Sequence, residues 1–217
     1  GVSCIGQADK GGGFPTSDSY IASNASFAGV AKGHIAPLIN SDGSISKQPA
    51  VVCVDGLPYP ALAISALHQA SSVGAERKER MSANIDDGDG LFGPAKRLTL
   101  SGVPGLAIPL DDNGSLRVSY ARHPSSYQAI SAVDVLNGSV DLSPLKDSWV
   151  LVGATAFGLD DVIPTPFSGA APGVELQARI LGSILDVNVP YSPRVAELLL
   201  GVMCICFAAL VMRVSAL

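Results

Sequence analysis

Charged residues are scarce in this chain of 217 residues, since Asp, Glu, Lys and Arg together make up 15% of it, against about 25% in typical soluble domains. Acidic residues outnumber basic ones by 19 to 14, which gives a net charge of −5 at pH 7. Proteins that bind the phosphate backbone present a basic surface. The composition therefore predicts no nucleic-acid partner.

Signatures of catalysis and cofactor binding are also missing. The sequence has no phosphate loop ending in Gly-Lys-Ser/Thr, no G-x-G-x-x-G after a predicted strand, no G-x-S-x-G elbow and no H-E-x-x-H or C-x-x-C pair. The histidines, His34, His68 and His123, are each isolated. The acidic stretch 86–90 has Leu91 where a calcium loop of the EF-hand type needs an oxygen ligand. We therefore expect no catalytic residue, no metal site and no cofactor.

Two further absences concern the cellular compartment. Only four cysteines occur, and Cys204 and Cys206 lie in an apolar run near the C-terminus. Cys4 and Cys53 lie in strand-like stretches, where a buried thiol and a disulfide are both compatible with the sequence. No signal peptide is visible. Because Gly1 stands directly before strand-like residues, we expect an N-terminal truncation.

The strongest feature that is present is the apolar C-terminal segment. Leu198–Met212 contains no charged residue, and its extension to Val195–Leu217 is about 34 Å long as a helix, enough for the roughly 30 Å hydrocarbon core of a bilayer. Apolar residues occupy every side of such a helix, and a domain of this size can seldom surround it as a core helix. We therefore predict a transmembrane helix over residues 194–217. Arg213 favours a cytoplasmic position for its far end.

Short apolar runs between turn residues predict many short elements before that helix. Helices are expected over residues 61–69, 130–136 and 172–185, and the apolar face of the last comprises Val174, Ala178, Leu181 and Leu185. Strands are expected over residues 2–6, 34–39, 45–54, 97–100, 106–110, 116–121 and 149–153, the last of them buried. Turns are expected at Asp42-Gly43 and at Asp55-Gly56. Residues 71–96 read as an exposed insertion and residues 155–168 as a loop. The predicted fold class is α/β or α+β, a mixed β-sheet with covering helices over residues 1–190.

Several short phrases occur in an order that is typical of one family. They begin with His34, Asp42-Gly43, Pro49 and the proline-led helix from Pro60, and they continue with LRVSY (116–120) and ISAVDVL (130–136). The most specific is VLVGATAFGLDD (150–161), which Thr165-Pro166 and PGVELQA (172–178) follow. Over about residues 30–190 the chain thereby resembles the type-two CHASE domain, an extracellular sensory module associated with bacterial cyclases and histidine kinases.

The resemblance implies a sensory domain that is followed by membrane helices and a cytoplasmic output module. The chain departs from the family in two respects. Further strand-helix units that normally open the domain are missing, which agrees with the expected truncation, and the acidic insertion at residues 76–90 is unfamiliar.

The loop after the strand 149–153 and the start of the next helix contain the candidate binding residues. Open sheets tend to bind ligands at the carboxyl ends of their strands. One interpretation is a polar ligand pocket formed by Thr155, Asp161, Thr165 and Glu175. The other is structural: Asp161 caps the loop, and Glu175 complements the dipole of the helix that follows.

These features predict a non-enzymatic sensor module in the cell membrane, with residues 1–190 outside the cytoplasm. Its partners are an unknown small-molecule or protein signal, the membrane, and a second copy of the full-length receptor if that receptor is a homodimer. Two alternatives stay open, a membrane-anchored binding or scaffold domain without signalling and an extracytoplasmic hydrolase. The absence of a nucleophile or metal signature disfavours the second.

Overall fold

The structure is a computed structural model that describes residues 14–17, 30–71, 83–155 and 161–215. Cys4 and the strand expected over residues 2–6 lie outside the described residues. The strands are β1 (Thr16–Ser17), β2 (Leu38–Ile39), β3 (Ile45–Pro49), β4 (Val51–Val54), β5 (Leu57–Pro60), β6 (Ala83–Asp87), β7 (Lys96–Leu100), β8 (Ala107–Leu110), β9 (Ser115–Arg117), β10 (Val162–Thr165) and β11 (Ser168–Pro172). The helices are α1 (Leu62–Ser71), α2 (Ala132–Leu136), α3 (Gly173–Leu185) and α4 (Ala196–Ser215).

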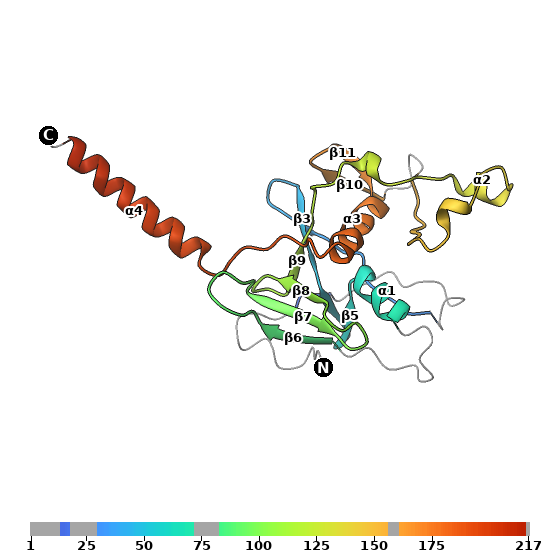
Figure 1. Cartoon of the computed structure of the whole chain (residues 1–217), viewed down its shortest axis with the longest axis horizontal. Helices are drawn as coiled ribbons and strands as arrows, with labels where there is room; N and C mark the ends of the chain where they lie inside the picture. The colour runs from blue at the N-terminus through green and yellow to red at the C-terminus, as the bar shows by residue number, and fades with distance from the viewer. Residues whose placement is uncertain (1–13, 18–29, 72–82, 156–160, 216–217) are drawn as a thin grey trace.

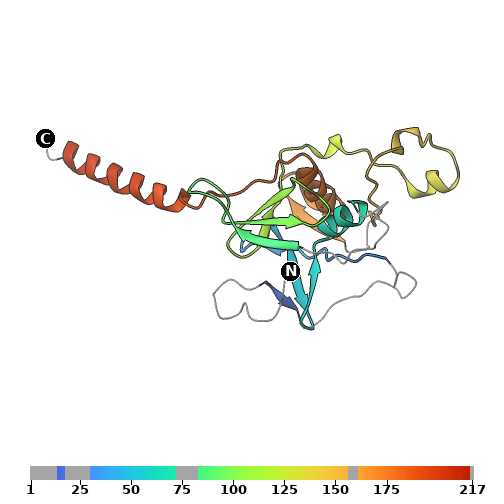
Figure 2. The same cartoon turned by 60° about the horizontal axis from the view of Figure 1, so that its bottom comes forward.

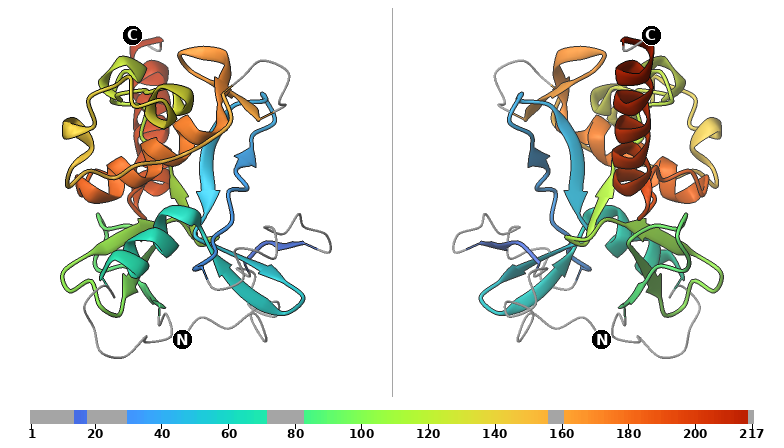
Figure 3. Two further views of the ribbon diagram at one scale, coloured as in Figure 1. Left: turned by 90° about the vertical axis from the view of Figure 1, so that its right-hand side faces the viewer. Right: turned by 90° about the vertical axis from the view of Figure 1, so that its left-hand side faces the viewer.

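The strands form several small sheets (Figure 1). β3 pairs with β2 and β9, β7 pairs with β6 and β8, and β10 pairs with β11, all in antiparallel fashion. β4 pairs antiparallel with β5 and parallel with β1. Figure 3 shows the β4–β5 hairpin and the β10–β11 hairpin at different corners of the molecule. The mixed class was predicted correctly, but several small sheets, built from local hairpins and from the long-range pairs β3–β9 and β1–β4, replace the expected single sheet.

Asp-Gly turns define two of these hairpins, as the sequence predicted. Between β2 and β3 the carboxylate of Asp42 accepts hydrogen bonds from the backbone amide and the hydroxyl of Ser44, at 2.9 and 2.6 Å. These bonds lower the pKa of Asp42. Asp55 and Gly56 join β4 to β5 with φ angles of 50° and 74°. Positive φ at both positions matches the right-handed twist of the strands.

The hydrophobic core lies between α1, α3 and one face of the small sheets (Figure 1). α3 contributes Leu176, Ile180, Leu181 and Ile184, each at most 3% exposed, and burying each side chain stabilises the fold by about 1.5–3 kcal/mol. The predicted apolar face of this helix was therefore largely wrong. Leu185 is 43% exposed, and the buried positions that the prediction omitted are occupied by Leu176, Ile180 and Ile184 together with the polar Gln177, Arg179 and Ser183.

The prediction of a buried strand over residues 149–153 is wrong. No described strand pairs with this segment, and Trp149, Val150 and Val152 are 46%, 56% and 89% exposed. An apolar run becomes a buried strand only where a neighbouring backbone pairs with it. The segment instead belongs to an arm, residues 121–155, in which no residue is buried. Figure 1 shows this arm, with α2, reaching outwards from the domain.

Two expected irregular segments contain strands. Part of the expected insertion, residues 83–87, is β6 and pairs along β7, while residues 72–82 lie outside the described residues. Residues 88–93 after β6 spell G-x-G-x-x-G, but they lead into β7 and not into the helix that a phosphate site requires. Within the expected loop 155–168, β10 forms a hairpin with β11.

The linker between α3 and α4 is held by hydrogen bonds to β9 and to the loop between β6 and β7. Arg117 donates from Nη2 to the hydroxyl of Ser192 at 2.9 Å, and Arg194 donates from Nη2 to the carbonyl of Ala95 at 2.7 Å. At the entry to α4, the amide of Val195 donates to the carbonyl of Leu91 at 3.3 Å. The position of α4 relative to the domain therefore depends on a few contacts of the linker.

α4 projects away from the rest of the molecule in two views (Figures 1 and 2). Its apolar side chains are exposed on all sides, for example Leu198 at 66%, Ile205 at 72% and Met212 at 67%. Within the described parts of the chain, no helix has the combined length and hydropathy needed to cross a membrane.

Candidate functional site

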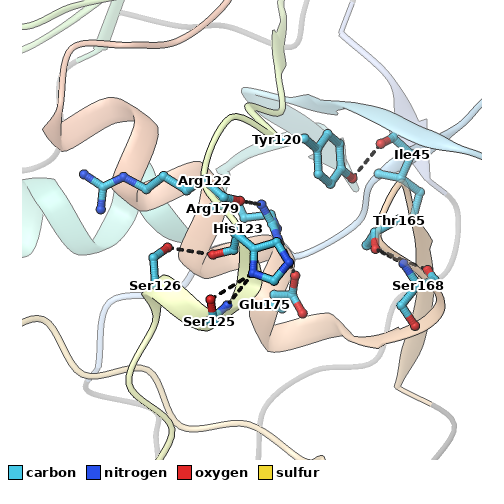
Figure 4. A network of polar contacts seen from close by, with 10 residues as sticks. All are labelled: Ile45, Tyr120, Arg122, His123, Ser125, Ser126, Thr165, Ser168, Glu175 and Arg179. Carbon is cyan, nitrogen blue, oxygen red and sulfur yellow. Dashed lines mark hydrogen bonds and ion pairs between the residues drawn. The ribbon is translucent and has the colours of Figure 1, made fainter.

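The guanidinium of Arg179 lies at the centre of a polar network on α3 (Figure 4). The side chain is 0% exposed. Its Nε and Nη2 atoms donate to Oε1 of Glu175 at 3.0 and 2.7 Å, one helical turn earlier. Its Nη1 atom donates to the carbonyl of Arg122 at 2.7 Å. A buried cation requires this degree of pairing, because an unpaired one costs several kcal/mol.

Aromatic rings complete the surroundings of this guanidinium. Cζ of Arg179 lies 5.2 Å from the ring centroid of Tyr120, 5.8 Å from that of Tyr127 and 5.1 Å from that of Phe167. All three distances are within the range of cation–π attraction. Burial raises the pKa of Tyr120, and the charge of Arg179 opposes the shift in part. The protonated phenol of Tyr120 donates to the carbonyl of Ile45 at 2.7 Å, which ties the network to β3.

A short loop, residues 122–126, closes over one side of the network (Figure 4). The ring of His123 contacts the ring of Phe167 edge to face, with centroids 5.4 Å apart. Nδ1 of His123 accepts a hydrogen bond from the amide of Ser125 at 3.3 Å, and Ser126 donates its hydroxyl to the carbonyl of His123 at 2.7 Å. α3, this loop and the β10–β11 turn thus meet at Arg179.

Near the N-terminus of α3, two glycines are closely approached by the side chains of other residues. A Cβ on Gly173 would lie 2.2 Å from Oδ1 of Asp161, and a Cβ on Gly153 would lie 2.5 Å from Cβ of Val174. A side chain at either position would therefore require the neighbouring side chain, Asp161 or Val174, to move. The N-cap, Pro172, offers no side-chain hydrogen bond, so the carboxylate of Asp161 lies where it complements the positive end of the helix dipole.

Among the described residues, no hydrogen bond joins the four sequence-predicted residues to one another. Asp161 lies beside Gly173, and its backbone carbonyl accepts the amide of that residue at 2.9 Å. Glu175 pairs with Arg179. Thr165 closes the β10–β11 turn, with Oγ1 donating to the carbonyl of Ser168 at 3.2 Å and accepting its amide at 3.1 Å. Thr155 is exposed, two residues after Gly153.

The structure adds to the structural interpretation of Asp161 and Glu175. Residues 156–160, which form most of the loop before Asp161, lie outside the described residues, and among the described ones the Asp161 carboxylate lies against Gly173. Glu175 lies in the first turn of α3, as expected, and also pairs with the buried cation of Arg179. The available signal was the spacing of Glu175 and Arg179, four residues apart, which is typical of an ion pair on a helix. The aromatic residues around Arg179 are distant in sequence and gave no such signal.

A second buried polar group lies beneath α3. Nε2 of Gln177 donates to Oε1 of Gln48 at 3.2 Å, and these two residues are 5% and 0% exposed. The ring nitrogens of His34 are buried without a hydrogen-bond partner among the described residues. Desolvation lowers the pKa of His34 to about 4, and the backbone carbonyl of Pro49 opposes this shift from a position short of full hydrogen-bond geometry.

The comparisons with known proteins agree with the resemblance seen in the sequence. The family model of the CHASE2 domain matches residues 14–212, which is most of the chain. No curated protein and no solved structure matches it.

The first prediction concerns the pairing of the buried cation. Glu175→Ala should lower the free energy of unfolding by about 3–5 kcal/mol, because Arg179 would be left buried without its carboxylate. Thr165→Val, which removes only an exposed pair of turn hydrogen bonds, should cost about 1 kcal/mol. Chemical unfolding of the detergent-solubilised chain measures both. Equal stability of the two variants would show that Glu175 is dispensable for folding, and its ligand-binding interpretation would then be preferred.

The second prediction concerns pH. The pKa of His34 is about 4 in the folded chain and about 6.5 in the unfolded chain. As the pH falls, His34 is therefore protonated in the unfolded chain before it is protonated in the folded chain. Stability should therefore be complete above pH 6.5 and fall by about 3 kcal/mol as the pH decreases towards 4. The difference between the wild type and His34→Gln, measured by unfolding across this range, isolates the effect. His123→Gln serves as the control, and a parallel pH profile of His34→Gln and the wild type would refute the assignment.

Proposed function

Because the chain belongs to the CHASE2 domain family, whose members are sensory domains of signalling receptors, we propose that it is the extracytoplasmic sensor of a bacterial transmembrane receptor. In this proposal α4 lies in the cell membrane, residues 1–190 lie outside the cytoplasm, and an output module of the cyclase, kinase or diguanylate cyclase type lies inside. No catalytic role is assigned to this chain.

The observation that carries the proposal is the character of α4. The span proposed here is the one expected from the sequence over residues 194–217, about 36 Å long as a helix, of which α4 (Ala196–Ser215) is the described part. An isolated helix that exposes apolar side chains on every side is unfavourable in water and favourable in lipid. Arg213 lies in its last turn, which suits a cytoplasmic end.

Residues next to the start of α4 support the position of this helix in a membrane. Leu91 and Phe92 are 67% and 69% exposed, and Leu91 accepts the amide of Val195 just before α4 begins. Exposed apolar side chains beside a membrane helix are favoured at the membrane interface. The β6–β7 loop would then rest on the outer surface of the bilayer.

A disulfide supports the extracytoplasmic location. Cys53 in β4 is disulfide-bonded, whereas Cys204 and Cys206 in α4 are free. Disulfides persist in oxidising compartments such as the periplasm and the cell exterior. Cys4, whose pairing with Cys53 the sequence left open, lies outside the described residues.

The relay in this proposal passes along α3. The start of α3 lies beside Asp161, its middle holds Arg179, and its end continues through residues 186–195 into α4. A ligand that contacts Thr155, Asp161, Thr165 or Glu175 would bias the position of α3, and the linker would transmit the displacement. This site and its signal, a small molecule or a protein, are part of the proposal.

The alternative is a membrane-anchored binding or scaffold domain, and the exposed arm favours it. Trp149, Val150 and Val152 present apolar side chains on an unpaired extended segment, which is the kind of surface that a protein partner or a second copy of the receptor covers. The two functions differ in one respect: only the sensor needs the position of α3 to affect the cytoplasmic side.

The third prediction tests the membrane assignment. Expression of residues 1–217 should place the chain in the membrane fraction, and residues 1–193 should not require detergent. A variant with Val202→Lys and Ile205→Lys keeps the length of α4 but removes its apolar character, so it should leave the membrane fraction. Arg122→Gln, on the folded domain, is the matched surface control. If the chain of residues 1–217 stays soluble and monomeric without detergent, the proposal is contradicted.

A further inference from the structure

We infer that a cavity between the linker and the β6–β7–β8 sheet binds a small amphipathic carboxylate, a molecule with a short aliphatic body and one carboxyl group. The cavity has a volume of about 250 Å³, equivalent to about eight water molecules at roughly 30 Å³ each. It is distinct from the network around Arg179. Its lining residues lie in the described parts of the chain.

The walls of the cavity are largely apolar. The sheet contributes Leu106 and Ile108, the end of α3 contributes Ile184, and the linker contributes Val187 and Val189. Ile184 and Ile108 are each 1% exposed, so this wall is the outer edge of the hydrophobic core. An aliphatic body that enters the cavity would gain about 0.8 kcal/mol for each buried CH₂ group.

One lining residue gives the cavity its preference for an anion. Arg97 of β7 carries the one formal charge among the described lining residues. Its Nη1 atom pairs with Oδ2 of Asp89 at 2.6 Å, but the side chain of Asp89 is 85% exposed. Because an exposed ion pair contributes about 1 kcal/mol or less, a ligand carboxylate can replace Asp89 at little cost. Tyr191 adds a phenol to the same cavity.

The linker side of the cavity contains a residue with a strained backbone, Val187, which a bound ligand would contact. Val187 has a φ of 53°, in the left-handed region where a β-branched residue is strained. This residue stands directly after the C-cap of α3, the position at which glycine is usual. Strain of this kind occurs at sites where the surrounding structure determines the backbone. A ligand in contact with Val187 would therefore act on the segment that positions α4.

The site can be tested with hexanoate, a carboxylate with a six-carbon chain. The full-length chain, with isotope-labelled Ile, Leu and Val methyl groups, is placed in lipid nanodiscs and titrated by NMR. Methyl signals of Ile108, Ile184 and Val187 should shift with saturation, whereas those of Ile45 and Ile64, which do not line the cavity, should not. Hexanol, which lacks the charge, and acetate, which lacks the body, should each bind more weakly, by about tenfold or more.

Variants separate the roles of charge and volume. Arg97→Gln should weaken hexanoate about tenfold and leave hexanol unchanged, because only the charge-assisted contact is lost. Asp89→Asn should tighten hexanoate, since Arg97 loses its competing partner. Ala107→Phe, at an exposed lining position, should abolish binding of both by filling the cavity. Lys146→Gln, which removes a positive charge on the exposed arm outside the cavity, is the matched control.

The inference is overturned if hexanoate leaves the cavity methyl groups unshifted, or if Arg97→Gln and Ala107→Phe bind it as the wild type does. Because the cavity belongs to the folded domain, this result is independent of the membrane assignment. Failure of the fractionation experiment would remove the proposed sensory function, and the same titration would then be made on the chain in solution without nanodiscs.

Discussion

The constraint on which the rest of the structure depends is the burial of one positive charge. The guanidinium of Arg179 has no exposed surface, and a charge in such a position costs several kcal/mol unless its donors are used. The compensation comes from three parts of the chain: Glu175 on the same helix, the carbonyl of Arg122, and aromatic rings that include Phe167 of the β10–β11 turn. The burial of Arg179 therefore specifies how these three segments pack together.

α3 also packs against the remainder of the domain, so the position that Arg179 fixes for this helix affects its other contacts. Its apolar face enters the core, Gln177 reaches the buried Gln48, and its C-terminal end forms one wall of the linker cavity. The helix thus connects a polar network near its start with the segment that leads to α4. In a sensor, a ligand bound at one end of α3 can therefore change the packing at the other end through this single helix.

The sequence predicted local features well and long-range packing poorly. The turns at Asp42-Gly43 and Asp55-Gly56 depend only on neighbouring residues, and they occur as predicted. The bounds of α3 followed from Pro172 and periodicity, but its buried face did not, because a buried Arg179 is contrary to the rule that charges stay outside. The segment 149–153 has the composition of a buried strand, yet burial requires a pairing partner that composition does not reveal.

The direct test of the central constraint is a double variant at the ion pair. If Glu175→Leu destabilises the fold because it leaves the charge of Arg179 uncompensated, the double variant Glu175→Leu/Arg179→Leu should be more stable than Glu175→Leu alone. The expected difference is about 1–3 kcal/mol, because proteins often tolerate the replacement of a whole buried ion pair by apolar residues. Chemical unfolding of the wild type, the two single variants and the double variant gives this difference. A double variant that is no more stable than Glu175→Leu would show that the buried charge is not what organises the segments around α3.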